Sequence, residues 1–133
     1  MKNILYIDDE PEVLRVVKEA LEHKGYRVLT TSQVAEFQRM LNAERVDLVL
    51  LDVQMPEQGG LDLFHDLRQR QKLPVLFVTG YPEEFSMQSS KFVKLWREEF
   101  WEGDTDILYK PFNDEVLFEK VASLIGRPSE DLV

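Results

Sequence analysis

Residues 46–51 read VDLVLL, and this nearly continuous apolar run ends directly before Asp52. Similar short runs occur at residues 4–7 (ILYI) and 74–78 (PVLFV). Strands that are covered by helices on both faces read in this way, because neither face contacts water. The three runs therefore predict buried strands of a parallel sheet.

Five such runs alternate with segments of helical periodicity along the 133 residues of the chain. The predicted strands are Asn3 to Ile7, Tyr26 to Thr30, Val46 to Leu51, Pro74 to Thr79 and Asp106 to Tyr109. Among the predicted helices, Gly25 ends the first, Ser32 caps the second and Asn113 caps the last. The alternation favours an α/β fold, a doubly wound parallel sheet with helices on both faces.

Length and composition bound the class of protein. A chain of 133 residues is long enough for one core, so we expect one domain at residues 1–126 and a tail or linker stub at residues 127–133. A net charge of −9 argues against direct binding to nucleic acid. The chain has no Cys and no apolar run of membrane-spanning length, so we expect a cytoplasmic protein with no membrane contact.

Polar residues of several kinds follow the predicted strands. Asp8 and Asp9 come after the first strand, Asp52 after the third, Thr79 at the end of the fourth and Lys110 after the fifth. Each one alone is most simply a solvated loop residue or a helix cap. Ligands of open parallel sheets bind at the carboxyl ends of the strands, however, and four strand ends bring suitable groups to one edge. The coincidence predicts a functional site.

The residue types point to phosphoryl chemistry that depends on a metal ion. Clustered carboxylates repel one another unless a cation neutralises them, and oxygen ligands without His or Cys favour Mg²⁺. An Asp carboxylate such as Asp52 can attack phosphorus and form an acyl phosphate. The ammonium of Lys110 and the hydroxyl of Thr79 would then meet the charge on the phosphoryl oxygens.

Four segments carry a resemblance to a known family: IDDEPEVLR (7–15), LDVQMPEQGGLDL (51–63), VTGYP (78–82) and LYKPF (108–112). The chain resembles the response-regulator receiver domain of two-component signalling, the CheY-like superfamily, over nearly its whole length. The resemblance implies a flavodoxin-like sheet of five parallel strands in the order 2-1-3-4-5, flanked by five helices. It also implies a switch in a phosphorelay. Such a domain catalyses its own phosphorylation and dephosphorylation, and it is not an enzyme that acts on an outside substrate.

The resemblance assigns roles to individual residues. It implies that Asp52 is the phosphoacceptor, Asp9 a direct magnesium ligand, Asp8 a ligand through water, the Gln54 backbone carbonyl and Asp52 further ligands, Thr79 the switch hydroxyl, and Lys110 the cation that pairs with Asp52 or its phosphate. It further implies a cis peptide between Lys110 and Pro111. The partner would be a sensor histidine kinase or a histidine phosphotransfer protein.

Two features depart from the usual pattern of the family. The interval between Thr79 and Lys110 is longer than is typical, which predicts that the fourth helix is lengthened by about two turns. Its apolar residues could form a homodimer or effector surface: Phe92, Trp96, Phe100 and Trp101. The second departure is Ile107, which stands where receivers commonly carry a Tyr or Phe, so the usual coupling of Thr79 to an aromatic ring is in doubt unless Tyr81 or Tyr109 replaces it.

Other functions remain as alternatives. The main one is a protein-interaction module on the same fold that works without phosphorylation. A magnesium-dependent phosphatase with the same Asp nucleophile would need a substrate cover for which 133 residues leave little room, and a flavin-binding protein would not present anions to a phosphate. His23 and His65 lie in predicted helices away from the strand ends, and Gly59-Gly60 lacks the Lys and Thr of a phosphate-binding loop.

Overall fold

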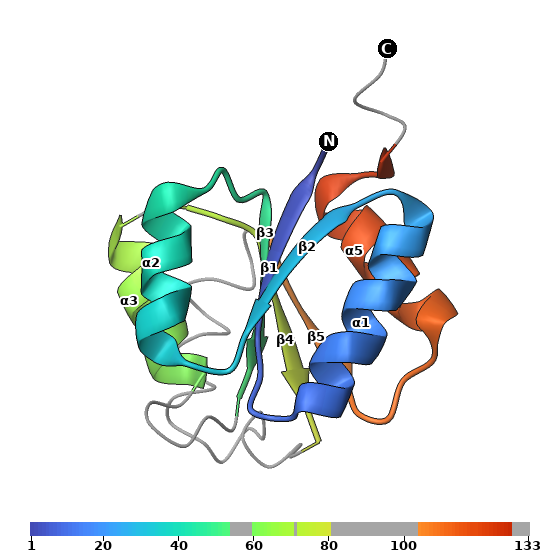
Figure 1. Ribbon diagram of the computed structural model, residues 1–133, viewed down its shortest axis with the longest axis horizontal. Coiled ribbons are helices and arrows are strands. Elements are labelled where there is room, and N and C mark those ends of the chain that lie inside the picture. Colours follow the sequence, from blue (N-terminus) through green and yellow to red (C-terminus); the bar gives the residue numbers. More distant parts are fainter. Residues whose placement is uncertain (54–59, 71, 81–103, 129–133) are drawn as a thin grey trace.

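Strands and helices alternate along the chain in the computed structural model, which describes residues 1–53, 60–70, 72–80 and 104–128 (Figure 1). The strands are β1 (Asn3–Ile7), β2 (Arg27–Thr31), β3 (Leu48–Asp52), β4 (Val75–Thr79) and β5 (Thr105–Tyr109). The helices are α1 (Pro11–Lys24), α2 (Val34–Ala43), α3 (Gly60–Arg70) and α5 (Asp114–Ile125). The predicted fourth helix lies outside the described residues.

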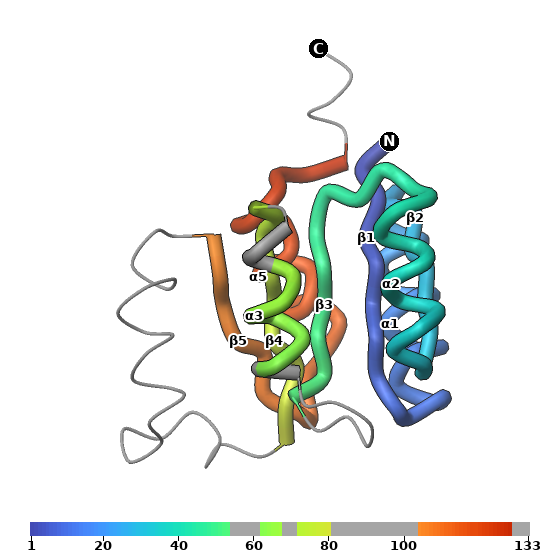
Figure 2. Tube along the Cα trace, turned by 90° about the vertical axis from the view of Figure 1, so that its left-hand side faces the viewer, coloured from blue at the N-terminus to red at the C-terminus, as the bar shows by residue number. Residues whose placement is uncertain are grey.

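The strands form one parallel sheet in the order β2-β1-β3-β4-β5, which confirms the predicted topology. Helices α2 and α3 cover one face of the sheet, and α1 and α5 cover the other (Figures 1 and 2). Strands β3 and β4 are buried at every position, as their apolar sequences predicted. None of the described helices is long and apolar enough to cross a membrane.

Successive residues of β1 point to opposite faces and so join different cores. Leu5 and Ile7 pack in the core beneath α2 and α3. Ile4 and Tyr6 pack in the core beneath α1 and α5. Asp8 follows with the same two-residue period, so its side chain belongs to the face that carries Tyr6.

Two of the predicted helix ends are confirmed and one is wrong. Gly25 ends α1 with a left-handed φ of 108°, and the Asn113 side chain accepts a hydrogen bond from the backbone N–H of Val116 at the start of α5. Ser32 does not cap α2, because Gln33 occupies the N-cap position without a side-chain cap bond. The Thr31 hydroxyl instead accepts a hydrogen bond from the Gln33 N–H at 3.1 Å, which fixes the turn before α2.

Replacing Asn113 by alanine is expected to lower the free energy of unfolding by about 1 kcal/mol. The substitution removes the 2.8 Å bond from the Val116 N–H to Asn113 Oδ1, which satisfies a donor at the start of α5. Urea unfolding followed by circular dichroism measures the change. Asn42→Ala, at an exposed position inside α2, is the matched control and should not destabilise the protein; equal losses in both variants would contradict the cap.

Because all strands run in the same direction, their carboxyl ends meet at one edge of the sheet, here called the rim. Asp8 follows β1, Asp52 ends β3, Thr79 ends β4 and Lys110 follows β5. Backbone hydrogen bonds join neighbouring strand ends. The Asp8 N–H donates to the Thr31 carbonyl at 3.2 Å, and the Lys110 N–H donates to the Thr79 carbonyl at 2.7 Å. The fold therefore brings these four predicted site residues to one edge of the sheet.

Candidate phosphoryl-acceptor site

Asp52 and Thr79 lie at the ends of β3 and β4, two adjacent and fully buried strands. Both side chains are buried, and Asp52 is in register with Val78, the residue before Thr79. The Val53 N–H donates to the carbonyl of Val78 at 3.3 Å, which extends the pairing of β3 with β4 past Asp52. A carboxylate and a hydroxyl are thus held at adjacent strand ends by the least exposed part of the sheet.

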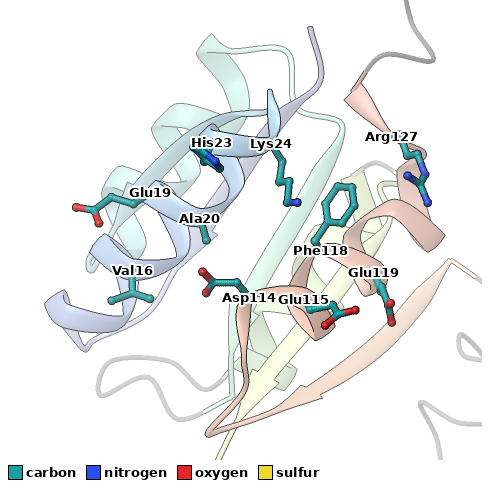
Figure 3. Close-up of a pocket in the computed structure, with 10 residues that line it drawn as sticks. All are labelled: Val16, Glu19, Ala20, His23, Lys24, Asp114, Glu115, Phe118, Glu119 and Arg127. Atoms are coloured by element: carbon teal, nitrogen blue, oxygen red, sulfur yellow. The ribbon is translucent and has the colours of Figure 1, made fainter.

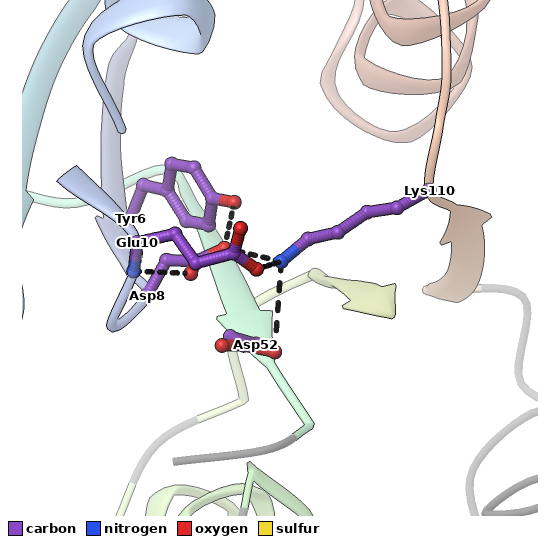
Figure 4. A network of polar contacts seen from close by, with 5 residues as sticks. All are labelled: Tyr6, Asp8, Glu10, Asp52 and Lys110. Carbon is purple, nitrogen blue, oxygen red and sulfur yellow. Dashed lines mark hydrogen bonds and ion pairs between the residues drawn. The ribbon is translucent and has the colours of Figure 1, made fainter. Parts of the chain in front are cut away.

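Asp8 is a carboxylate at the rim with no exposed surface, and both of its oxygens accept hydrogen bonds (Figure 4). Its Oδ1 accepts a hydrogen bond from the backbone N–H of Glu10 at 2.9 Å. Its Oδ2 accepts a hydrogen bond from the Tyr6 hydroxyl and lies 3.1 Å from Lys110 Nζ. A buried carboxylate needs such donors, because removing it from water is costly when it is unpaired.

Lys110 reaches across the rim and places its ammonium between three carboxylates (Figure 4). Nζ lies 3.1 Å from Asp8 Oδ2, 2.9 Å from Glu10 Oε1 and 4.0 Å from Asp52 Oδ1. Partial burial disfavours the charged form of Lys110. The hydrogen bond to Glu10 and the negative charge of Asp8 outweigh burial and raise the pKa of Lys110 above its usual value.

The position of Lys110 refines the prediction. Its pairing with Asp52 was expected from the resemblance, and the structure places it closer to Asp8 and Glu10 than to Asp52. The predicted cis peptide between Lys110 and Pro111 is confirmed. In this structure the ammonium is therefore held mainly by the acids that follow β1.

Glu10 was not predicted as a site residue, although it follows Asp8 and Asp9 directly. It is the N-cap residue of α1, and its carbonyl accepts hydrogen bonds from the N–H groups of Val13 and Leu14 at 3.1 Å. Its side chain is more than half exposed and bonds Lys110, which lies 100 positions later in the sequence. A contact over this distance depends on how the strand ends come together, so no local sequence pattern could have revealed it.

The acidic residues after β1 could hold a cation. One carboxylate oxygen from each of Asp8, Asp9 and Glu10 lies within 4.8 Å of the others. Asp8 is buried, whereas Asp9 and Glu10 are exposed, so the cluster combines a fixed ligand with ligands open to solvent. An all-oxygen set of this kind suits a hard ion such as Mg²⁺. The predicted ligand Gln54 lies outside the described residues.

Tyr6 was also missed by the sequence analysis, which treated it as a core residue of the first strand. Burial raises the pKa of the Tyr6 hydroxyl well above its usual value, and the charge of Asp8 raises it further. The hydroxyl therefore keeps its proton at neutral pH and donates a hydrogen bond to Asp8 Oδ2. The signal was available, because a hydroxyl two positions before Asp8 in a strand must point to the same face.

Ile107 lies in β5, where it is partly buried and packs against the core beneath α2 and α3. An aliphatic side chain at this position offers no ring that could turn toward Thr79. Of the two residues considered as replacements, Tyr109 is 48 % exposed and stands beside Lys110, and Tyr81 lies outside the described residues. Coupling of Thr79 to an aromatic side chain stays untested.

A hollow of about 800 Å³ lies between α1 and α5, away from the rim chemistry (Figure 3). The acidic residues that line it are Glu19, Asp114, Glu115 and Glu119, and the basic ones are His23, Lys24 and Arg127. Lys24 Nζ lies 4.8 Å from the centre of the Phe118 ring, a cation–π contact that bridges α1 and α5. His23 sits in the last turn of α1, which agrees with its exclusion from the candidate site.

A doubly wound parallel sheet with a buried Asp, a Lys and an acidic cluster at its rim is the arrangement expected of an α/β protein that accepts a phosphoryl group at the carboxyl ends of its strands. Residues 4–122 match the family described as the response regulator receiver domain. The chain belongs to this family, and it is a receiver domain of the kind found in two-component response regulators.

Sequence and structure comparisons agree on this family. The chain is 33 % identical over 127 residues to the transcriptional regulatory protein CpxR of Klebsiella pneumoniae, an alignment that covers 96 % of the chain and 50 % of CpxR. It thus spans about half the length of that relative. The response regulator TrrA of Thermotoga maritima, solved in complex with Mg²⁺ and BeF, has a TM-score of 0.76 and 30 % identity, with 93 % of this chain and 99 % of TrrA covered.

TrrA has also been solved in complex with the histidine kinase ThkA. That structure matches with a TM-score of 0.75 and 29 % identity over 94 % of this chain and 99 % of the matched chain. These findings confirm the family and the fold expected from the sequence. They leave the roles of individual residues in this chain as proposals.

Proposed function

We propose that Asp52 is the phosphoacceptor of this receiver domain and that transfer to it depends on Mg²⁺. The observation that carries the proposal is the ammonium of Lys110, which lies 4.0 Å from the buried Asp52 carboxylate and reaches it from the end of β5, across β4. A carboxylate oxygen of Asp52 would attack phosphorus while the bond from phosphorus to the imidazole nitrogen of a donor phosphohistidine breaks, leaving the donor histidine free. The charge that develops on the phosphoryl oxygens would be met by Lys110 and Thr79. Both groups stand at the same rim.

The acidic cluster supports the magnesium part of the proposal. Asp8 and Asp9 would hold the ion together with Asp52 and the predicted carbonyl of Gln54, and Glu10 is a further carboxylate within reach. When bound, Mg²⁺ supplies positive charge to carboxylates and phosphoryl oxygens that would otherwise repel one another. The relative TrrA was solved with Mg²⁺ and BeF, which agrees with this choice of ion.

The phosphoryl donor is proposed to be a phosphohistidine on a sensor histidine kinase or a histidine phosphotransfer protein, by analogy with the TrrA complex. A second hollow, of about 470 Å³, lies beside Lys110 and could admit a partner side chain. Its apolar walls are Val13, Val16, Pro111 and Phe112. The protein would act in the cytoplasm, with self-phosphorylation and autodephosphorylation as its own chemistry.

The proposed output is a change in protein contacts. The homodimer or effector surface predicted for Phe92, Trp96, Phe100 and Trp101 remains a prediction, because these residues lie outside the described part of the chain. The division into a domain at 1–126 and a tail at 127–133 likewise remains proposed, although the family match covers residues 4–122.

Binding of beryllofluoride, a mimic of the phosphoryl group, tests the proposal directly. We expect ¹H–¹⁵N spectra of the protein to shift at Asp52, Thr79 and Lys110 when beryllofluoride is added with Mg²⁺, and not when EDTA replaces the metal. The shifts follow from a new anionic group between Asp52 and Lys110. A folded protein with unchanged spectra would favour the alternative, an interaction module that works without phosphorylation.

A further inference from the structure

Asp8 accepts hydrogen bonds from side chains that a role as a metal ligand does not require. Its Oδ2 is shared between two donors of different kinds, the hydroxyl of Tyr6 and the ammonium of Lys110 at 3.1 Å. One donor belongs to a rigid aromatic side chain in β1, the strand that Asp8 follows, and the other ends a flexible side chain from the far side of the site (Figure 4). Only the Lys110 ammonium can move away from Asp8.

The proposed function gives the Lys110 ammonium two alternative positions, one before and one after Asp52 is phosphorylated. In this structure its ammonium contacts Asp8 and Glu10, and it lies 4.0 Å from Asp52. A phosphoryl group on Asp52 would draw the ammonium toward its oxygens. That movement weakens the pairing of Lys110 with Asp8, which is fully buried and cannot turn to bulk water for a replacement donor.

We propose that Tyr6 is a positioning residue of the phosphoryl site, whose hydroxyl holds the Asp8 carboxylate in place while Lys110 moves to the phosphoryl group. The inference rests on the proposed function and adds a residue to it. The Tyr6 ring suits the role, because it is fully buried in the core beneath α1 and α5. Its hydroxyl therefore cannot follow Lys110.

The loss of this hydroxyl should matter most when Lys110 has moved. Without it, Asp8 Oδ2 still has Lys110 in the unmodified protein, but it loses both donors when the ammonium turns to Asp52. The bond from the Glu10 N–H at 2.9 Å would hold only Oδ1. Asp8 would then compete with the phosphoryl group for Lys110. The loss of the Tyr6 hydroxyl would therefore destabilise the phosphorylated state more than the unphosphorylated one.

Tyr6→Phe tests the proposal because it removes the hydroxyl and keeps the buried ring. We expect the affinity for beryllofluoride at saturating Mg²⁺ to fall about tenfold, the size expected for one hydrogen bond to a charged group. The affinity for Mg²⁺ alone should fall by less than about threefold, because Lys110 can then keep its contact with Asp8. Both constants can be measured from amide shifts in ¹H–¹⁵N spectra.

Tyr26→Phe is the matched control. Tyr26 is also a buried tyrosine, and its hydroxyl donates to the carbonyl of Gly126 at 2.7 Å, outside the rim. This variant should bind beryllofluoride as the native protein does, and thermal unfolding of both variants checks that they are folded.

The outcomes separate the two proposals. If Tyr6→Phe binds beryllofluoride with native affinity, the proposed role of Tyr6 is overturned. An equal loss of affinity for Mg²⁺ and for beryllofluoride would also overturn it, because Tyr6 would then only support the metal site. A native protein that binds no beryllofluoride would instead overturn the proposed function, and the role of Tyr6 with it.

Discussion

Replacing Lys110 by alanine is expected to slow phosphoryl uptake from acetyl phosphate by about 100-fold or more. The ammonium lies 4.0 Å from Asp52 and is the cation that the structure places against this carboxylate. Removing it takes positive charge from the point where the phosphoryl oxygens become more negative. The rate can be followed by intact mass at fixed Mg²⁺ and acetyl phosphate.

The same substitution should also lower the free energy of unfolding in the absence of Mg²⁺, by about 1–3 kcal/mol. Asp8 would lose one of the two donors to its Oδ2, and its repulsion with Glu10 and Asp52 would no longer be offset. The Tyr6 hydroxyl and the Glu10 N–H remain, so the loss should stay below that of a buried carboxylate left with no partner.

Lys120→Ala is the control for a lysine that bridges a strand and a helix outside the site. Lys120 pairs with Asp106 at 3.2 Å, and both side chains are about one third or more exposed. Its loss should cost less than about 1 kcal/mol and leave the rate of phosphoryl uptake unchanged. A Lys110→Ala variant that is phosphorylated as fast as Lys120→Ala would show that Lys110 does not take part in the transfer.

The fold could be predicted from the sequence because its strands are buried on both faces. VDLVLL and PVLFV become β3 and β4, which are buried at every position, and parallel pairing then follows from the helices between the strands. Strand boundaries moved by a residue or two, as for Tyr26, which precedes β2 and packs beneath α1 and α5. Ser32 failed as a cap because the neighbouring Thr31 hydroxyl bonds the turn instead.

The site could be predicted only as a set of residues at strand ends. Asp8, Asp52, Thr79 and Lys110 come together because the strands that precede them are parallel. How those residues pair could not be predicted, since it depends on side-chain reach across the rim: Lys110 lies closer to Glu10 than to Asp52. The contact of Tyr6 with Asp8 could have been predicted from their two-residue spacing, but the sequence analysis read Tyr6 only as part of an apolar strand.

Asp52 carries the largest expected effect of any single residue. It is buried at the end of β3, and the proposal makes its carboxylate oxygen the atom that bonds to phosphorus. Asp52→Asn keeps the size of the side chain and one accepting oxygen, but it replaces the nucleophilic carboxylate by a neutral amide. This variant should therefore take up no phosphoryl group at any time point, whereas loss of Lys110 should only slow the reaction.

The most direct test of the central claim is intact mass after incubation with acetyl phosphate, for the native protein, for Asp52→Asn and for Asp106→Asn as a control acid in β5. The account predicts a gain of one phosphoryl unit in the native protein and in Asp106→Asn, which requires Mg²⁺ and is absent from Asp52→Asn. A gain that persists in Asp52→Asn, or a folded native protein that gains nothing with Mg²⁺ present, would contradict the assignment of Asp52 as the phosphoacceptor.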